Sequence, residues 1–452
     1  MIAIRILLGL IGLGVVVFVH ELGHFIAARL SGIDVEAFSI GWGNPLLKKK
    51  IGAVEYRLGM FPVGGYCKMR GENGFQEAWE NNKKSIGPEP GSFFSAKPWK
   101  RILVAFSGPF FNFLFAVVVL SFIWGRGIEI ETQENRIVLL KDIDGRSYPS
   151  DQGGLVTGDR IIAVNGREIN NYRDIQEHIA LNPDTNLSVT VLRNGTERSF
   201  TLRPSLDKTG AGKIGVYHWT EPLVEAVRPG SPADRAGLKA GDRIKAVDGE
   251  ELPYTVAVLR IFKDRKPVVF SLDFERDGRT GTAELDGIEY RDDFPDTGIE
   301  YRTLRFKTPD LSPFAALVKG GSEAFKTLAI SVKSLGLLFK KGIDLTQAVS
   351  GPARITYMVG DIAAGGFQQS VAAGLSTAAN FLALISIALC IMNLLPLPIL
   401  DGGLIVLFLV EILKRRPLNP KAVSAFQTAG MVIILGLMIF AVFNDILFFA
   451  AR

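Results

Sequence analysis

The chain has 452 residues, enough for several domains, and 48% of them are hydrophobic, with a mean hydropathy of +0.23. Only 21% are charged and the net charge is +5, with basic residues placed beside apolar runs, which indicates membrane orientation rather than nucleic-acid binding. The only two cysteines, Cys67 and Cys390, lie far apart, which excludes a disulfide framework.

The first apolar segment, 6–30, contains ionisable residues in the stretch VFVHELGHFIAARL. Charged groups at membrane depth are costly and therefore indicate function. His20 and His24 are four residues apart, so a helix places them on one face, where both can bind one ion. Glu21 beside them suits a base acting on ion-bound water, which is the HExxH zinc pattern. No small-residue cleavage site follows, so we expect a transmembrane helix over 1–30 rather than a signal peptide.

The loop 31–101 is rich in lysine and arginine, as is the loop 414–428. Both are expected to be cytoplasmic by the positive-inside rule, which places both termini and the region 125–375 on the other face. Within the first loop, 54–69 reads VEYRLGMFPVGGYCKM. Its alternating residues and the Gly64-Gly65 pair predict a β-hairpin that dips into the membrane, where its backbone would need hydrogen-bond partners. The alternative is a cytoplasmic hairpin that packs on the first span.

The second apolar segment, 102–124, is long enough to span a bilayer, which takes about 20 residues. It contains GPFFN at 108–112. This motif resembles the second-span motif of the site-2 protease family, and the resemblance makes Asn112 a candidate for substrate contact. The alternative is that this motif only kinks the helix and supplies an interhelical hydrogen bond.

The region after the second span contains a repeat. Residues 153–166, GGLVTGDRIIAVNG, match 236–249, AGLKAGDRIKAVDG, and the offset from Gly158 to Gly241 is 83 residues. Each copy predicts a glycine turn, a strand and an Asn-Gly or Asp-Gly hairpin turn. The pattern resembles tandem PDZ domains, mainly β (α+β), over 127–206 and 212–304. PDZ domains bind peptides by strand addition.

Two roles for these copies stay open: peptide binding, or a spacing and size-excluding role. The candidate peptide-binding loop is Ile214-Gly215-Val216, assigned to the second copy. Residues 306–375 combine apolar residues with regular lysines. They predict amphipathic helices at the membrane interface, not a further span.

The third apolar run, 377–413, would be about 55 Å long as one helix, too long for a hydrocarbon core of about 30 Å. Pro396 and Pro398 in NLLPLPILDGG, 393–403, must break it, and broken backbone at this depth lines a cavity or is buried in protein. Asp401 would then lie at the depth of His20 and His24 and is the candidate third ligand. The alternative is an exposed Asp-Gly turn. A fourth span is expected over 429–450.

HELGH in a first span, NLLPLPILDGG in a later one and PDZ-like copies between them resemble the site-2 protease family of intramembrane zinc metalloproteases, over nearly the whole chain. The resemblance implies one catalytic Zn²⁺ bound by His20, His24 and Asp401, with Glu21 as general base. It implies that Asn393 contacts the scissile peptide or its oxyanion. It also implies that substrate pairs with the hairpin around Gly64, Gly65 and Tyr66.

The same resemblance implies a multi-pass protein of the bacterial inner membrane, with termini and PDZ copies in the periplasm. Its substrates would be single-span membrane proteins already cut on their outer side, such as an anti-sigma factor in sigma-E stress signalling or signal-peptide remnants. The main alternative is a catalytically inactive, membrane-anchored PDZ scaffold. A transporter would leave the glutamate unexplained, and the chain shows no inverted repeat.

Overall fold

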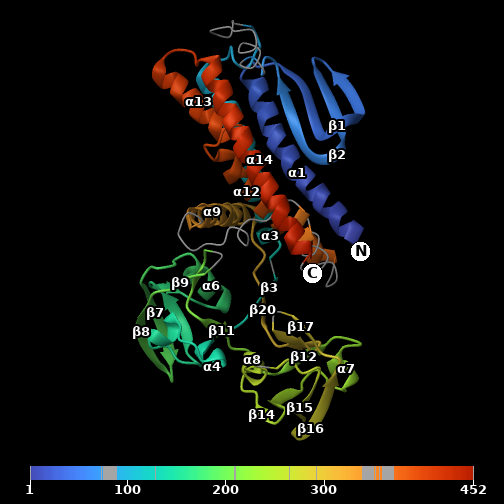
Figure 1. Ribbon diagram of the computed structural model, residues 1–452, viewed down its shortest axis with the longest axis vertical. Coiled ribbons are helices and arrows are strands. Elements are labelled where there is room, and N and C mark those ends of the chain that lie inside the picture. The colour runs from blue at the N-terminus through green and yellow to red at the C-terminus, as the bar shows by residue number, and fades with distance from the viewer. Residues whose placement is uncertain are drawn as a thin grey trace. The chain divides into compact units, whose positions relative to one another are not determined.

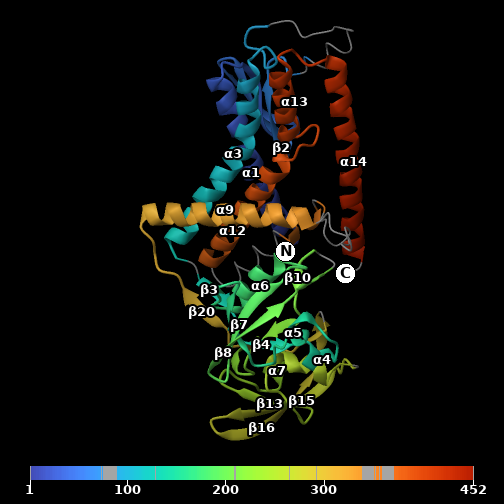
Figure 2. The same cartoon turned by 90° about the vertical axis from the view of Figure 1, so that its left-hand side faces the viewer.

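The computed structural model describes residues 2–72, 74, 89–127, 129–207, 210–263, 265–291, 293–337, 351, 353–355, 357–358 and 371–450. It divides into two compact units (Figures 1 and 2). The first unit comprises 1–128, 309–335 and 345–452, and the second comprises 129–308 and 336–344.

The first unit is mainly helical. Its elements are α1 (Ile2–Leu30), β1 (Val35–Ile51), β2 (Val54–Met69), α3 (Pro98–Gly125), α9 (Pro313–Leu337), α12 (Val371–Leu394), α13 (Asp401–Lys414) and α14 (Pro420–Ala450). Within the described residues, four helices are long and apolar enough to cross a membrane, over Gly9–Leu30, Pro98–Gly125, Gly374–Leu394 and Pro420–Phe448. The chain is therefore a polytopic α-helical membrane protein, as the apolar segments predicted.

Small residues let α1 and α3 pack closely. A Cβ built on Gly23 would lie 2.5 Å from the Ser107 carbonyl oxygen, so only glycine fits at this crossing. Ala28 on α1 and Ala116 on α3 are fully buried. This close crossing brings the histidine-bearing part of α1 against the middle of α3.

The loop after α1 forms a sheet of four strand segments, although only β1 and β2 supply them. Residues 35–40 of β1 pair with 65–69 of β2 on one side and with 55–58 on the other, and 45–51 pair with 54–59. The segment order is therefore 45–51, 54–59, 35–40, 65–69. The prediction of a hairpin within 54–69 is wrong, because 35–40 lies between the segments 54–59 and 65–69 and pairs with both; the hairpin that forms joins 45–51 to 54–59. Residues 65–69 form an edge segment with no other paired strand among the described residues.

The predicted interfacial helices of 306–375 correspond in the described chain to α9, whose apolar side chains are largely exposed, for example Phe314 and Phe325. α9 is not one of the four candidate spans. Residues 338–350 and 359–370, which the same prediction covered, lie outside the described residues.

The second unit is β-rich. Its elements are β3 (Glu129–Thr132), β4 (Ile137–Leu139), α4 (Lys141–Asp144), α5 (Pro149–Gln152), β5 (Arg160–Val164), β6 (Arg167–Glu168), α6 (Tyr172–Ala180), β7 (Leu187–Arg193), β8 (Thr196–Leu202), β9 (Ser205–Leu206), β10 (Gly212–Lys213), β11 (Val216–His218), β12 (Val224–Val227), α7 (Pro232–Arg235), β13 (Arg243–Val247), β14 (Glu250–Glu251), η1 (Thr255–Ala257), α8 (Val258–Ile261), β15 (Val269–Arg276), β16 (Arg279–Asp286), β17 (Glu289–Arg291), β18 (Phe294–Asp296), β19 (Ile299–Tyr301) and β20 (Leu304–Lys307).

The sequence repeat corresponds to two equivalent four-stranded sheets, ordered β6-β5-β7-β8 and β14-β13-β15-β16. The predicted Asn-Gly and Asp-Gly turns are present, with φ of +50° at Asn165 and at Asp248, as a tight hairpin turn requires. Each copy has its own buried apolar core.

The boundary between the copies differs from the predicted one. β11 pairs with β4 of the first copy, and Ile214 is buried in that copy's core. Residues 212–218 therefore belong to the first copy, and Ile214-Gly215-Val216 were assigned to the wrong one. The repeat motif could not reveal this, because the strand that completes each copy lies far in sequence from the matching 14 residues.

A buried ion pair is repeated at the same 83-residue offset: Asp159 with Arg193, and Asp242 with Arg276. The Asp242 carboxylate is fully buried and also accepts a hydrogen bond from the Lys239 N–H at 2.8 Å. Burial alone would raise the pKa of Asp242, but the hydrogen bonds from Arg276 and Lys239 lower it below its ordinary value of 3.8.

Replacing Asp242 by Ala should therefore destabilise the second copy by roughly 2–3 kcal/mol, because charge-assisted hydrogen bonds are lost and their donors are left unpaired. Since the folded state lowers the pKa of Asp242, its contribution is present above about pH 4 and is lost as the pH falls further. Amide hydrogen exchange of β13 in the full-length protein measures both effects.

Asp286→Ala is the matched control, because Asp286 is 70% exposed and pairs with the half-exposed Arg235. An exposed pair contributes about 0–1 kcal/mol. Equal changes in β13 exchange for both variants would contradict the role assigned to the buried pair.

Candidate metal centre

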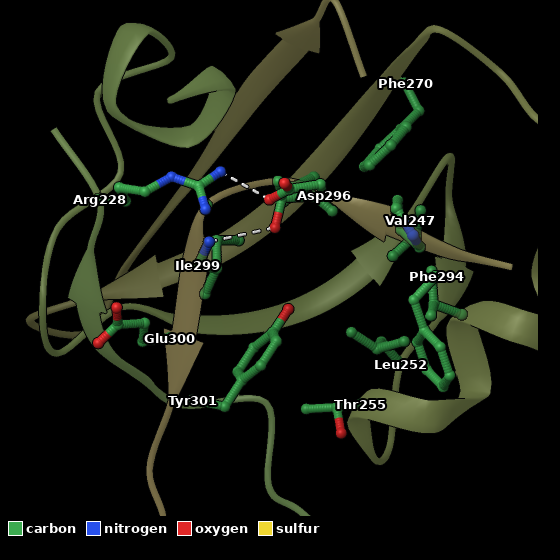
Figure 3. Close-up of a pocket in the computed structure, with 15 residues that line it drawn as sticks. Arg228, Val247, Leu252, Thr255, Phe270, Phe294, Asp296, Ile299, Glu300 and Tyr301 are labelled. Atoms are coloured by element: carbon green, nitrogen blue, oxygen red, sulfur yellow. Dashed lines mark hydrogen bonds and ion pairs between the residues drawn. The ribbon is translucent and has the colours of Figure 1, made fainter. Parts of the chain in front are cut away.

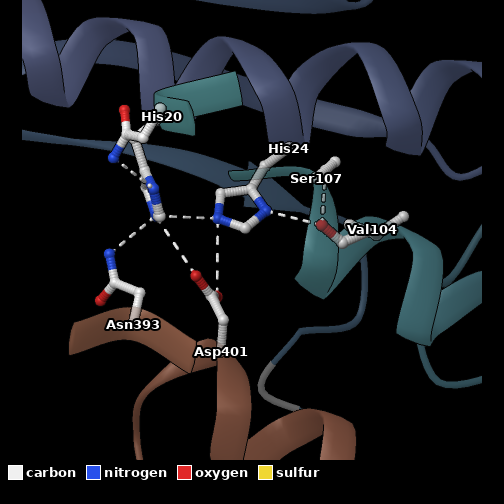
Figure 4. Close-up of polar contacts among 7 residues, drawn as sticks. His20, His24, Val104, Ser107, Asn393 and Asp401 are labelled. Atoms are coloured by element: carbon white, nitrogen blue, oxygen red, sulfur yellow. Dashed lines mark hydrogen bonds and ion pairs between the residues drawn. The ribbon is translucent and has the colours of Figure 1, made fainter. Parts of the chain in front are cut away.

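Helix α1 presents two imidazoles to one point. His20 and His24 are one turn apart, and their Nε2 atoms are 3.1 Å from each other (Figure 4). The two side chains are only 12% and 10% exposed. Two neighbouring ring nitrogens directed at the same point form half of a tetrahedral metal site.

Asp401 approaches the same point from α13. The predicted break lies where expected, since α12 ends at Leu394 and α13 begins at Asp401. Asp401 is therefore the first residue of a helix, where the helix dipole favours a carboxylate. The intervening chain folds tightly over this helix start, because a Cβ on Gly402 would lie 2.3 Å from the Leu394 carbonyl oxygen. Ile399, two residues before Asp401, has a φ of +81°, which is unusual for a β-branched residue.

The three side chains converge. Asp401 Oδ2 is 3.3 Å from His20 Nε2, and Asp401 Oδ1 is 3.5 Å from His24 Nε2. These are the only three metal-ligating side chains grouped in this way among the described residues. A tetrahedron with ligands about 2.0–2.1 Å from a zinc ion has edges of about 3.3–3.4 Å, so the three separations fit that ion.

The second ring nitrogen of each histidine is also held. His24 Nδ1 lies 2.8 Å from the Val104 carbonyl oxygen. His20 Nδ1 lies 3.3 Å from Asn112 Nδ2. Such outer contacts fix the orientation of metal-binding imidazoles.

Gly108 makes room for both imidazoles. A Cβ at this position would lie 2.4 Å from His24 Nε2 and 2.7 Å from His20 Cε1. The GPFFN motif therefore serves the metal centre directly. Asn112 at its other end is completely buried, and the predicted substrate contact by this side chain stays a prediction.

A cavity of about 630 Å³ opens beside the three ligands and is also lined by Glu21 and Asn393. Residues 66–69 of the edge segment form part of its wall, and Gly65 packs beside Glu21. Trp42 occupies the space beside Gly64, where any side chain would collide with its indole. The predicted substrate-pairing residues thus lie around the candidate centre.

Sequence reasoning missed several cavity residues, notably Glu72 and Gln427. Glu72 accepts a hydrogen bond from the Met69 N–H at 3.2 Å, and Gln427 comes from α14. Neither belongs to a motif, so only the tertiary arrangement reveals them. Cys67 also lines the cavity, and burial raises the pKa of its thiol, which keeps it neutral and unreactive.

The remaining predicted residues lie elsewhere. Ile214, Gly215 and Val216 belong to the β-rich unit. So do the other two histidines: His178 contacts the Asp174 carbonyl, and His218 contacts Thr220. As expected, neither histidine belongs to the candidate metal centre.

Comparisons with known proteins show the family of the chain. The model of peptidase family M50 matches residues 8–437. The chain belongs to peptidase family M50. It is 38% identical over 448 residues to a putative zinc metalloprotease of Treponema pallidum, covering 98% of this chain and 99% of that one. It is also 31% identical to the regulator of sigma-E protease RseP of Escherichia coli, over 96% and 97% of the two chains.

These matches confirm the resemblance to the site-2 protease family that the motifs predicted. This M50 peptidase is a metalloprotease, and the names of its relatives indicate zinc as the metal. The scaffold alternative, which needed an inactive centre, loses its support.

Proposed function

We propose that this M50 peptidase binds one zinc ion through His20, His24 and Asp401, with Glu21 as the general base. The convergence of two imidazoles and a carboxylate at edges of 3.1–3.5 Å supports this assignment. A bound zinc ion would act as a Lewis acid and lower the pKa of water toward about 7.

The chain's own residues would then carry the proton and position the substrate. Glu21 takes the proton of the attacking water and returns it to the leaving amine. Asn393 directs its amide toward the metal centre and donates a hydrogen bond to the oxygen of the scissile carbonyl. Hydrolysis forms a carbon–oxygen bond and breaks the peptide carbon–nitrogen bond.

The proposed substrate is the transmembrane segment of a single-span protein, unwound and paired with the edge segment 65–69. Two N–H groups of this edge face carboxylates rather than a strand: Cys67 contacts Glu21, and Met69 contacts Glu72. Alternate N–H groups at an unpaired edge can donate hydrogen bonds to the carbonyl oxygens of an added strand. The addition would place a substrate backbone beside Glu21.

Four apolar helices and relatives named for sigma-E regulation support a place in a bacterial inner membrane. On this proposal 31–101 and 414–428 are cytoplasmic, while the termini and the β-rich unit are periplasmic. An anti-sigma factor in sigma-E stress signalling and signal-peptide remnants are the proposed substrates, cleaved after a first cut on their outer side.

The two β-rich copies are proposed PDZ-like gates, and they differ in openness. The second copy has a cavity of about 310 Å³ (Figure 3). One wall is formed by η1 and α8, which contribute Thr255 and Val258, and the opposite wall by β18 and β19, which contribute Ile299 among others. In the first copy Tyr172 is buried and donates to the Val216 carbonyl at 2.9 Å. The Tyr172 side chain thus occupies the edge of this strand, so Ile214-Gly215-Val216 offer no site for a peptide. The second copy is therefore the better docking module.

Excising 133–303 tests the gating. Thr132 pairs with Leu304, so an Asn-Gly turn joining them should close β3 and β20 into a hairpin and keep α3 linked to α9. We expect the variant to cleave a trimmed single-span reporter at a rate near that of the full chain. It should also cleave an untrimmed reporter with a folded outer domain, which the full chain rejects.

Cleavage is measured with purified protein in proteoliposomes, and a zinc chelator is the control for metal dependence. Unchanged rejection of the untrimmed reporter by the excised variant would remove the gating role. Failure of both proteins to cleave either reporter would instead count against the proposed substrate class.

A further inference from the structure

Asn112 does not line the cavity beside the candidate centre, and it is polar, fully buried and placed against a proposed metal ligand. Its Nδ2 lies 3.3 Å from His20 Nδ1, and its Oδ1 is buried without a hydrogen-bond partner among the described residues. A buried polar group without a partner is costly. The placement of the Asn112 side-chain amide beside the His20 imidazole therefore needs a physical explanation.

The interhelical hydrogen bond between α3 and α12 does not explain the side chain. The bond between α3 and α12 at this level runs from Ser386 Oγ to the Asn112 backbone carbonyl, at 2.8 Å. Any residue at position 112 would provide that carbonyl. The amide group must therefore be explained by what it contacts, which is His20.

The two histidines have different partners behind them. His24 Nδ1 faces the Val104 carbonyl, which can only accept, so in the neutral ring Nδ1 carries the proton and Nε2 is the unprotonated nitrogen that can bind a metal. His20 Nδ1 faces a side-chain amide, which can donate through Nδ2 or accept through Oδ1.

We propose that Asn112 is the positioning residue of His20 and serves both of its neutral forms. Without metal, Asn112 Nδ2 donates to His20 Nδ1 while the proton on Nε2 faces Asp401. With metal, His20 Nε2 is the ligand, the ring proton is on Nδ1, and Asn112 Oδ1 accepts it after the amide turns over. The turn breaks no existing hydrogen bond of Oδ1, and the imidazole stays neutral, so no net proton is gained or lost.

This inference rests on the proposed role of His20 as a zinc ligand. It gives the last residue of the GPFFN motif a role complementary to that of Gly108, which makes room for the same rings. Outer-shell partners of this kind typically change metal affinity by about 10–100-fold when they are removed.

The test compares Asn112→Leu with Asn112→Asp in the full-length protein. Leucine has nearly the same size but offers no acceptor, so zinc affinity, measured by chelator competition, should fall about 10–100-fold, and the absorption spectrum of the cobalt(II) form should shift. Aspartate accepts from Nδ1–H, so Asn112→Asp should bind zinc at least as tightly as the wild type.

A purely structural role for Asn112 predicts the reverse order, because a buried apolar leucine is tolerated better than a buried charge. Zinc affinity that is unchanged in Asn112→Leu, or lower in Asn112→Asp than in Asn112→Leu, would overturn the inference. Thermal unfolding of the metal-free variants shows whether any loss of affinity only follows a loss of fold, which would also overturn it.

Two controls separate this inference from the proposed function. Ser386→Ala removes the hydrogen bond to the Asn112 carbonyl but leaves its amide in place, so it should lower thermal stability without changing zinc affinity. His20→Ala should lose zinc binding; if it does not, the proposed ligand set fails. If His20→Ala loses zinc and Asn112→Leu does not, only the role of Asn112 fails.

Discussion

Replacing Glu21 by Gln should abolish peptide hydrolysis while leaving the zinc content unchanged. Glutamine keeps the size of the side chain but cannot take a proton from water, and a positioned general base contributes about 10²–10⁴-fold. Glu21 lines the cavity but is not one of the three converging ligands, so metal binding should survive. The measurement pairs reporter cleavage with zinc content by atomic absorption.

Glu36→Gln is the matched control, because Glu36 is a surface residue paired with the half-exposed Lys68. It should retain both zinc and activity. A Glu21→Gln protein that cleaves the reporter at the wild-type rate would refute the general-base assignment. Loss of zinc in Glu21→Gln would instead make Glu21 a ligand, and the proposed coordination would have to be redrawn.

The candidate centre was predictable because each half of it is encoded locally. Helical periodicity alone directs His20 and His24 to one face, and two prolines in an apolar run too long for one span force the break before Asp401. The structure adds that these halves meet at 3.3–3.5 Å. Depth in the membrane, inferred from flanking basic residues, was enough to match them.

The surroundings of the centre were less predictable, because a backbone carbonyl and the absent Cβ of a glycine determine much of how the two imidazoles are placed. The Val104 carbonyl that orients His24 could belong to any residue, and Gly108 acts by lacking a Cβ. The sequence marked Asn112 as polar in a span but could not separate substrate contact from a kink with an interhelical hydrogen bond. Its complete burial and its contact with His20 become visible only in the structure.

The β-rich region shows a similar division. The hairpin turns and the 83-residue repeat could be predicted from the sequence, since Asn-Gly and Asp-Gly pairs have a local conformational preference. The pairing of β11 with β4 joins residues about 78 positions apart and leaves no local signal. The buried pairs Asp159–Arg193 and Asp242–Arg276 share the repeat offset, so a search for charged residues at that period could have found them.

The other large expected effect is that Gly108→Ala should lower zinc affinity by roughly 100-fold or more while the fold survives. The new methyl group would lie 2.4 Å from His24 Nε2 and 2.7 Å from His20 Cε1, so both rings must move. Ligands displaced by more than about 0.5 Å no longer form a working site. Overpacking costs about 1–3 kcal/mol, and the better helix propensity of alanine offsets about 1 kcal/mol of it.

Gly436→Ala provides the matched control, because its methyl group would meet nothing within 4 Å on α14. It should leave zinc affinity and cleavage unchanged. The comparison separates two explanations of Gly108: a requirement for helix flexibility, which both substitutions would affect, and a requirement for space beside the imidazoles, which only Gly108→Ala removes. Tight zinc binding by Gly108→Ala would show that the histidines bind metal in a different arrangement, and the ligand triangle inferred from α1 and α13 would then be wrong.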